Sequence, residues 1–180
     1  AGYRGYFLKN EGVLLHQGLL NLALKKLVDK GFTPMATPTM VREFALIGSG
    51  HFPAGRPEIY EVEEFSGTKD KETKFLVGTA EPSLLAYHSD EVVEVKDLPI
   101  KLCGISPCYR REVGGYGKDT KGLYRVHEFM KVEQVILCKA DINEAYQWLE
   151  NLRTISEEIL QELKLPYRVL NISTGDMGAG

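Results

Sequence analysis

Two segments of this chain carry the spacing of apolar residues that is typical of helices. Residues 11–30 are rich in leucine and alanine and end at Gly31, a common helix stop, so they predict a long, well-buried helix. Residues 141–164 keep apolar side chains at helical spacing, and Asp141 with Glu144 makes a start that resembles a capping box. These segments predict two long helices, one near each end of the chain.

The remaining segments predict strands, turns and one short helix. The expected strands cover residues 32–41, 59–65, 74–77, 100–105 and 167–172. Pro34 and Pro38 favour an edge or interface position for the first of them, because proline cannot donate to a ladder. Residues 42–57 are expected to be irregular, and Pro82 is suited to begin a short helix over 83–88. This order of elements indicates a single α+β domain, an antiparallel β-sheet flanked by helices.

The stretch SPCYRREVGGYGKDTKGLYRVHEFMKVEQV, residues 106–135, reads as two charged strands joined by a glycine-rich loop. Side chains at i and i+2 share one face of a strand, so Arg110 is expected to project together with Glu112. One face of the second strand would carry charged and aromatic side chains: Arg125, His127, Phe129, Lys131 and Glu133. The other face would be apolar and would join the core: Val126, Met130, Val132 and Ile136.

This charged face suits a negatively charged ligand that also carries a flat group. Arginine offers a planar fork of donors that matches phosphate or carboxylate oxygens, which makes Arg110 and Arg125 candidates. Phe129 is placed to stack on a purine ring, and Glu133 lies about 13 Å further along the strand at 3.3 Å per residue. Taken singly, each feature is common on protein surfaces, and the loop 113–124 also fits a plain solvated loop. The combination on one face favours a ligand site.

Composition narrows the class of protein. Hydrophobic residues make up 43% and charged residues 26%, as in an ordinary soluble protein, and no apolar run approaches the roughly 18 residues of a membrane span. The net charge of -3 argues against a general nucleic-acid binder, although residues 101–131 are locally basic. Three cysteines without a C-x-x-C pair argue against a disulfide framework and a structural zinc site, so we expect a cytoplasmic location.

Residues 106–135 resemble motif 2 of the seryl-tRNA synthetases, which are class II enzymes, and Tyr109–Glu112 match the class pattern of aromatic, arginine, any residue, glutamate. Val77–Leu85, VGTAEPSLL, resemble the serine-binding TAE element of that family, and Lys30–Val41 resemble its motif 1. The resemblance covers essentially all of residues 1–180, as one catalytic-core domain.

The resemblance implies a class II catalytic core that activates serine with ATP and transfers the seryl group to the acceptor end of tRNA(Ser). It implies that ATP is bound by Arg110, Arg111, Glu112, Arg125, Val126 and Phe129. It implies that serine is bound by Thr79, Ala80, Glu81, Arg110 and Glu133. Catalysis would rest on Arg110, Glu112 and Arg125. Arg110 would hold the α-phosphate and the serine carboxylate and neutralise charge at phosphorus, Glu112 would help to bind ATP, and Arg125 would reach the outer phosphates. Motif 1, here Phe32–Val41, would form a homodimer interface.

Parts of the family pattern are missing from this sequence. They are motif 3, the downstream glutamate expected to hold Mg²⁺, and the N-terminal helical arm that grips the tRNA. We therefore expect a truncated core with impaired turnover and with no metal ligand of its own. The missing arm keeps one alternative open, a relative that loads an amino acid onto a carrier protein. A second alternative is a non-catalytic binding module, although the intact Arg110, Glu112, Thr79, Glu81 and Glu133 speak against decay of the site.

Overall fold

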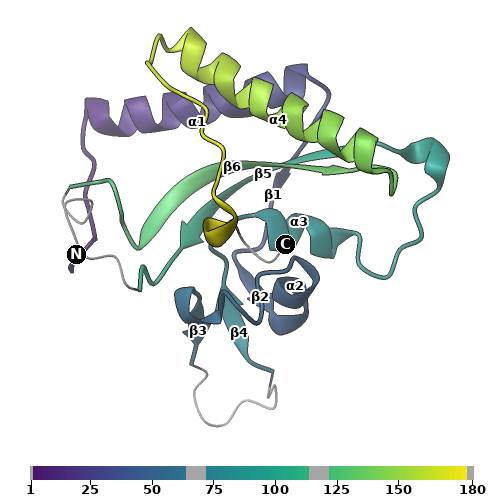
Figure 1. Ribbon diagram of the computed structural model, residues 1–180. Coiled ribbons are helices and arrows are strands. Elements are labelled where there is room, and N and C mark those ends of the chain that lie inside the picture. The colour runs from purple at the N-terminus through teal and green to yellow at the C-terminus, as the bar shows by residue number, and fades with distance from the viewer. Residues whose placement is uncertain (1, 64–71, 114–121, 178–180) are drawn as a thin grey trace.

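A computed structural model describes residues 2–63, 72–113 and 122–177 of the chain. Within them lie two three-stranded sheets, four α-helices and short 3₁₀ turns, arranged as Figure 1 shows. The helices are α1 (Glu11–Asp29), α2 (Glu43–Gly48), α3 (Glu81–Tyr87) and α4 (Ile142–Glu162). The strands are β1 (Thr33–Ala36), β2 (Met40–Arg42), β3 (Tyr60–Val62), β4 (Lys74–Leu76), β5 (Ile100–Tyr109) and β6 (Glu128–Leu137). The 3₁₀ turns are η1 (Arg56–Glu58), η2 (Val95–Asp97) and η4 (Thr174–Asp176).

The larger sheet has the strand order β1-β5-β6 and is covered by helices on both faces (Figure 1). Strands β5 and β6 form a long antiparallel ladder that runs from Ile100 opposite Leu137 to Tyr109 opposite Glu128. Strand β1 pairs with β5 in parallel, so the sheet is mixed rather than wholly antiparallel as expected. The helices α1 and α4 lie on one face and α3 lies on the other, which confirms the flanked α+β layout.

Alternation along β6 divides its side chains between two apolar clusters. Val132 and Ile136 pack toward α1 and α4, where Leu27, Phe32 and Ile155 are buried. On the opposite face, Val135 packs with residues of α3 and β5: Ala80, Leu84 and Leu102. The apolar face predicted for this strand is therefore confirmed at Val132 and Ile136, whereas Val135 lies on the face that was predicted to be charged.

The smaller sheet has the order β2-β4-β3 and encloses a third apolar cluster with α2. The rings of Phe52 and Phe75 meet edge to face with centroids 5.1 Å apart. Leu46 and Val77 are fully buried beside them. Residues 42–57 were expected to be irregular. Part of this segment forms α2 and packs into the cluster, so the expectation was incomplete.

Two further expectations about the first half of the chain were wrong. Only Leu20 and Leu27 are buried on α1, whereas Leu14 and Leu15 are 72% and 75% exposed, so the helix is not well buried in this chain. Residues 32–41 are not one strand, because the chain leaves the larger sheet after β1 and enters the smaller one at β2.

The C-terminal part combines a confirmed helix with a missing strand. Asp141 caps α4 by accepting a hydrogen bond from the backbone N–H of Glu144 at 2.9 Å, as its capping-box start predicted. Residues 167–172 form no strand, because this segment pairs with neither sheet, and Leu170 and Ile172 are 69% and 68% exposed. No helix among the described residues has the length and apolar content that a membrane crossing requires.

Candidate active site

The end of β5 is fixed by backbone hydrogen bonds to segments that adjoin the smaller sheet, one after β4 and one in η1. The N–H of Tyr109 donates to the carbonyl of Val77 at 2.8 Å, and the N–H of Arg111 donates to the carbonyl of Glu58 at 2.8 Å. Between them, the N–H of Arg110 donates to the carbonyl of His127 at 3.0 Å. The expected strand 100–105 thus continues to Tyr109, and its end is held on two sides.

The side chain of Arg110 lies along a glycine backbone. Its Nε donates to the carbonyl of Gly78 at 3.3 Å. A Cβ atom at residue 78 would stand 3.4 Å from both Cγ and Nε of Arg110, so a larger residue there would crowd the arginine. Glycine in this place lets the guanidinium approach the chain that leads into the TAE element.

Strand β6 begins at Glu128, so Arg125, Val126 and His127 precede the strand and do not follow its alternation, contrary to the sequence prediction. The alternation holds from Phe129 onward. The guanidinium carbon of Arg110 lies 5.4 Å from the centroid of the Phe129 ring, and Lys131 Nζ lies 5.7 Å from the same centroid. Lys131 Nζ is also 3.6 Å from a carboxylate oxygen of Glu133. A guanidinium, a ring and a carboxylate therefore occupy one face, which we call the charged face.

Glu112 does not share a strand face with Arg110, because the chain turns sharply there. Its φ of 52° lies in the left-handed region, which is uncommon for a residue other than glycine. Its side chain is only 9% exposed and pairs with Arg125 Nη1 at 2.6 Å, while Arg4 Nη1 donates to its carbonyl at 2.8 Å. Arg111 is exposed and lines a different hollow, together with Arg56 and other residues of the smaller sheet.

The TAE element meets the charged face at Glu133. Thr79 Oγ1 donates a hydrogen bond to the Glu133 carboxylate. Glu81 is the first residue of α3, so the helix starts before the predicted Ser83. Burial raises the pKa of the Glu81 carboxyl, nearby Glu133 raises it further, and His51 and Lys131 partly offset the increase.

The side chain of Ala80 packs in the core against the same side of the larger sheet as Glu133. Its side chain is fully buried, and a Cβ atom on Gly104 would stand 2.9 Å from the Ala80 Cβ. Glycine at 104 therefore lets the start of α3 sit close against β5. Gly104 lies opposite Glu133 in the ladder, so it also belongs to the floor beneath the two carboxylates. A ligand contact from Ala80 would come from its backbone.

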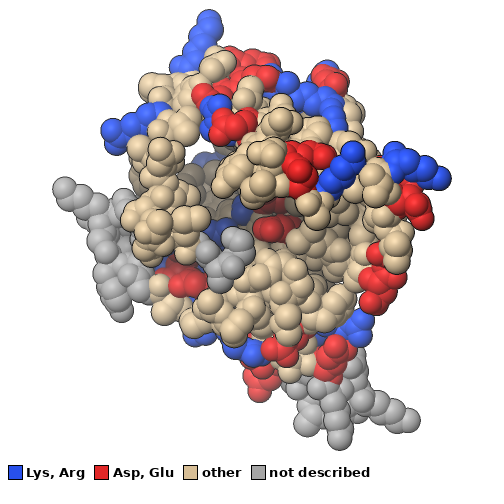
Figure 2. All heavy atoms as spheres, turned by 45° about the vertical axis from the view of Figure 1, so that its right-hand side comes forward, with Lys and Arg blue, Asp and Glu red and all other residues tan. Residues whose placement is uncertain are grey.

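Three of the predicted residues, Arg110, Glu112 and Arg125, line one cavity of about 290 Å³. The other lining residues come from the segment after α2 and from the turn before α3: His51, Gly55, Glu58, Ile59 and Gly78. A space-filling view shows a hollow with acidic and basic side chains at its floor (Figure 2). Sequence analysis missed this contribution because glycines and prolines made residues 42–57 read as a plain loop. The only signal was a histidine set among them.

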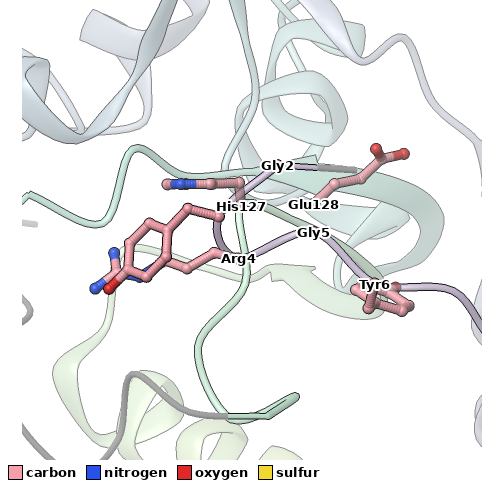
Figure 3. A pocket seen from close by; sticks show the side chains of 7 residues that line it. Gly2, Arg4, Gly5, Tyr6, His127 and Glu128 are labelled. Atoms are coloured by element: carbon pink, nitrogen blue, oxygen red, sulfur yellow. The ribbon is translucent and has the colours of Figure 1, made fainter.

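The N-terminal segment, residues 2–6, lies beside the start of β6 and lines a second hollow with it. Figure 3 shows Gly2 to Tyr6 passing next to His127 and Glu128, and these residues line a hollow of about 480 Å³. The His127 ring meets Tyr3 and Tyr60 edge to face at 6.4 and 6.2 Å, and its Nδ1 is 3.0 Å from the Arg110 carbonyl. His127 therefore supports the backbone of Arg110 from behind.

Metal ligands and cysteines add little to the described part of the site. Among residues 2–63, 72–113 and 122–177, no three His, Cys, Asp or Glu side chains gather as a metal site would require. Cys108 lies under the charged face, opposite Phe129 in the ladder, and burial raises the pKa of its thiol, so it stays protonated at neutral pH. The predicted loop 113–124 lies largely outside the described residues.

Comparison with known proteins places this geometry in a family. The model of the tRNA synthetase class II core domain (G, H, P, S and T) matches residues 60–180. A serine–tRNA ligase of Pyrococcus horikoshii is 45% identical over 178 residues, which are 99% of this chain and 37% of the relative. One of Deinococcus radiodurans is 43% identical over 180 residues, 100% of this chain and 41% of the relative. The chain thus spans about two fifths of the length of these relatives.

Solved structures agree with the sequence matches. The crystal structure of seryl-tRNA synthetase from Pyrococcus horikoshii complexed with ATP has a TM-score of 0.88 and 44% identity, covering 99% of this chain and 38% of that one. Cytoplasmic serine–tRNA ligase from Naegleria fowleri in complex with AMP has a TM-score of 0.87 and 36% identity, covering 97% and 39%. Prolyl-tRNA synthetase of Giardia lamblia, at 23% identity and a TM-score of 0.75, shares the fold.

Proposed function

This chain belongs to the family of class II tRNA synthetase core domains, and from that premise we propose that it is the serine-activating core of a serine–tRNA ligase. The observation that carries the proposal is the charged face, where Arg110, Phe129 and Glu133 lie together beside the TAE element. Its substrates would be ATP, serine and the acceptor end of tRNA(Ser). Its location would be the cytoplasm, as for the Naegleria fowleri relative.

The proposed first step joins serine to AMP. A carboxylate oxygen of serine attacks the α-phosphorus of ATP, a new P–O bond forms, and the bond to pyrophosphate breaks. Arg110 would hold the serine carboxylate and the α-phosphate together and neutralise charge that builds at phosphorus. Phe129 would stack on adenine, and its ring already has two cations beside it, Arg110 and Lys131. These groups fit a nucleotide.

Binding of ATP would break the ion pair between Arg125 and Glu112. Arg125 would reach the outer phosphates, and its side chain is 47% exposed, so it can exchange partners without first leaving the core. Glu112 would then be free to accept from ATP. Val126 would contribute through its backbone. Arg111 is the least supported of these residues, since it lines a different hollow from Arg110.

Serine would be recognised by its ammonium and its hydroxyl. Thr79 and Glu81 would hold the ammonium group, with the backbone of Ala80 between them, and Glu133 would accept from the hydroxyl. Alanine would leave Glu133 without that donor, and a site built to hydrogen-bond a substrate hydroxyl discriminates by about 10⁴ or more. Thr79 already donates to Glu133, so part of this carboxylate is positioned before the ligand arrives.

Mg²⁺ would accompany ATP, because this ion usually binds through one or two carboxylates together with substrate phosphates. Among the described residues, no three potential ligands gather into a preformed metal site. We therefore derive no step through Mg²⁺ on this chain.

We also propose that the chain forms a homodimer through the motif 1 region. The burial of each motif 1 residue indicates whether it belongs to the core of its own chain or to the interface. Phe32 is 4% exposed and belongs to the core of its own chain, so it is not an interface residue. Met40 is 49% exposed, and an apolar hollow of about 340 Å³ lies beside it, lined in part by Pro38, Phe44 and Tyr87. This hollow and the edge of β1 would meet their symmetry mates in the dimer.

Calorimetric titration with a non-hydrolysable seryl-adenylate mimic tests the proposal. We expect the wild-type chain to bind and Arg110→Ala and Glu133→Ala to bind about tenfold to a hundredfold more weakly, as for lost hydrogen bonds to charged groups. Arg153→Ala, on the exposed face of α4, is the matched control and should bind as wild type does. Failure of the wild-type chain to bind would contradict the proposal. Equal binding of glycyl and seryl mimics would show that Glu133 does not recognise the serine hydroxyl.

A further inference from the structure

Glu112 lies at a backbone turn that is held by contacts from distant segments of the chain. Its φ of 52° is uncommon for a residue other than glycine, and such a conformation persists only where its surroundings fix it. The N–H of Arg111 donates to the carbonyl of Glu58 at 2.8 Å, and the N–H of Val113 donates to the carboxylate of Glu58 at 3.3 Å. The peptide group between Glu112 and Val113 is therefore held on its N–H side.

The carbonyl side of the same peptide group is held by Arg4, which lies 108 residues earlier in the chain. Arg4 Nη1 donates to the Glu112 carbonyl at 2.8 Å. Arg4 belongs to a turn in which the N–H of Gly5 donates to the carbonyl of Gly2 at 3.0 Å, and its own φ is 59°. The N–H of His127 donates to the Arg4 carbonyl at 3.3 Å, which anchors this turn beside the start of β6 (Figure 3). The guanidinium therefore reaches Glu112 from an anchored backbone.

The turn at Glu112 determines where its carboxylate lies. The side chain is only 9% exposed, it pairs with Arg125 Nη1 at 2.6 Å, and both residues line the cavity that Arg110 also lines. The backbone dihedral φ fixes the direction in which a side chain leaves the chain. A turn that relaxed to an ordinary φ would therefore move the carboxylate away from Arg125 and out of its place in the cavity.

We propose that Arg4 is a positioning residue for ATP binding, which acts through Glu112. Its guanidinium holds the Glu112 carbonyl, keeps the turn in the left-handed conformation and so places the Glu112 carboxylate in the cavity. The proposal rests on the proposed function, in which Glu112 accepts a hydrogen bond from ATP. Arg4 lines the hollow of the N-terminal segment and not the cavity of Arg110, so its effect on ATP is indirect.

Four single variants and one double variant test this role. Arg4→Met removes the guanidinium, whereas Arg4→Lys keeps a positive charge and N–H donors on a long side chain. Lys9→Met is the matched control, because it removes an exposed cation from the same end of the chain. Glu112→Gly removes the carboxylate, and glycine adopts the left-handed conformation without strain, so the turn persists. These proteins, and the double variant of Arg4→Met with Glu112→Gly, are checked for folding by urea unfolding and titrated with ATP by calorimetry.

We expect Arg4→Met to bind ATP about fivefold to thirtyfold more weakly than wild type, which is less than the loss of a direct hydrogen bond to a charged group. Arg4→Lys should recover part of the loss, and Lys9→Met should bind as wild type does. Glu112→Gly should also bind ATP more weakly. Adding Arg4→Met to Glu112→Gly should have no further effect, because the guanidinium acts only through the position of the Glu112 carboxylate.

Three results would overturn the proposal. Equal ATP affinity of Arg4→Met and wild type would overturn it and leave the proposed function intact. The same loss from Arg4→Met in the wild-type and Glu112→Gly backgrounds would show that Arg4 supports the fold of the site and does not act through Glu112. Absence of ATP binding to the wild-type chain would overturn both this proposal and the proposed function. If Arg4→Met does not fold, Arg4→Lys takes its place in the same comparison, with a smaller expected loss.

Discussion

Replacing Glu81 with glutamine should make the fold more stable and should weaken binding of the aminoacyl ligand. Glu81 is a partly buried carboxylate near a second one, Glu133, and burial followed by that neighbour raises its pKa above the ordinary 4.5. Its ionised form is therefore held in the native state at a free-energy cost. A bound cation would remove this cost, and the ammonium group of serine is the cation we propose.

The sign of the stability effect follows from proton linkage. The folded chain keeps the Glu81 proton to higher pH than the unfolded chain does, so this group stabilises the fold fully below about pH 4.5. That contribution is lost as pH rises through the raised pKa of the native state. Glu81→Gln is neutral at every pH, so it should be more stable than wild type at pH 8, and the difference should vanish near pH 4. The start of α3 favours a carboxylate by about 0.3–1 kcal/mol, which reduces the gain without being its cause.

Binding should change the other way. A hydrogen bond between charged groups contributes about 1.5–3 kcal/mol, so Glu81→Gln should bind a seryl-adenylate mimic about tenfold to 150-fold more weakly at pH 8. Wild-type affinity should also fall as pH is lowered toward the raised pKa of Glu81, because the protonated carboxyl loses its attraction for the ammonium group. The variant should show a smaller fall over the same pH range.

Urea unfolding and calorimetry over pH 4–8 measure both effects on the same two proteins. Asp90→Asn provides a matched control, since it removes one carboxylate from an exposed turn. The reasoning is refuted if Glu81→Gln is less stable than wild type at pH 8, or if it binds the mimic equally well. Either result would mean that Glu81 is not a partly buried carboxylate whose charge is compensated by a bound cation.

Three further results are expected. Phe129→Ala should weaken binding of ATP by about 1–3 kcal/mol in calorimetry, the range for loss of one base stacked on an aromatic ring, whereas Phe129→Tyr should not. Arg125→Ala leaves the Glu112 carboxylate unpaired, so it should lower the free energy of unfolding by about 1–3 kcal/mol in urea, and the added change Glu112→Gln should restore most of it. Met40→Glu should convert a dimer into a folded monomer in light scattering, and a wild-type monomer at high concentration would refute the interface.

The features that the sequence could predict depend on residues that are close together in the chain. The division of β6 into a charged and an apolar face follows from a period of two that every strand obeys, so Phe129 and Glu133 could be placed together without coordinates. The cap at Asp141 also depends on residues three positions apart. Both predictions needed only neighbours in the chain, and both were confirmed.

The errors concern features that depend on distant partners. Burial of α1 depends on what covers its outer side, and its apolar spacing alone did not tell which leucines are covered. Residues 167–172 have strand-forming side chains, but a strand must also pair with a sheet, and these residues pair with none. Glu112 leaves its strand at a positive φ, a turn that the alternation rule could not reveal. His51 acquires its orientation from Ser49, whose own bond to Ala45 exists only because α2 forms.

The arrangement at the end of β5 explains why the side chain of Arg110 can be probed without disturbing the fold. Its two neighbours in sequence are tied by their backbones to different segments, Tyr109 to Val77 and Arg111 to Glu58. Its own N–H is bonded to His127, so three consecutive amides are held irrespective of the side chain. Alanine at position 110 keeps all three bonds and loses the guanidinium, together with one contact to the Gly78 carbonyl. A loss of ligand affinity in Arg110→Ala with unchanged urea unfolding would therefore report on the site itself, whereas a parallel loss of stability would show that the guanidinium also holds the two sheets together.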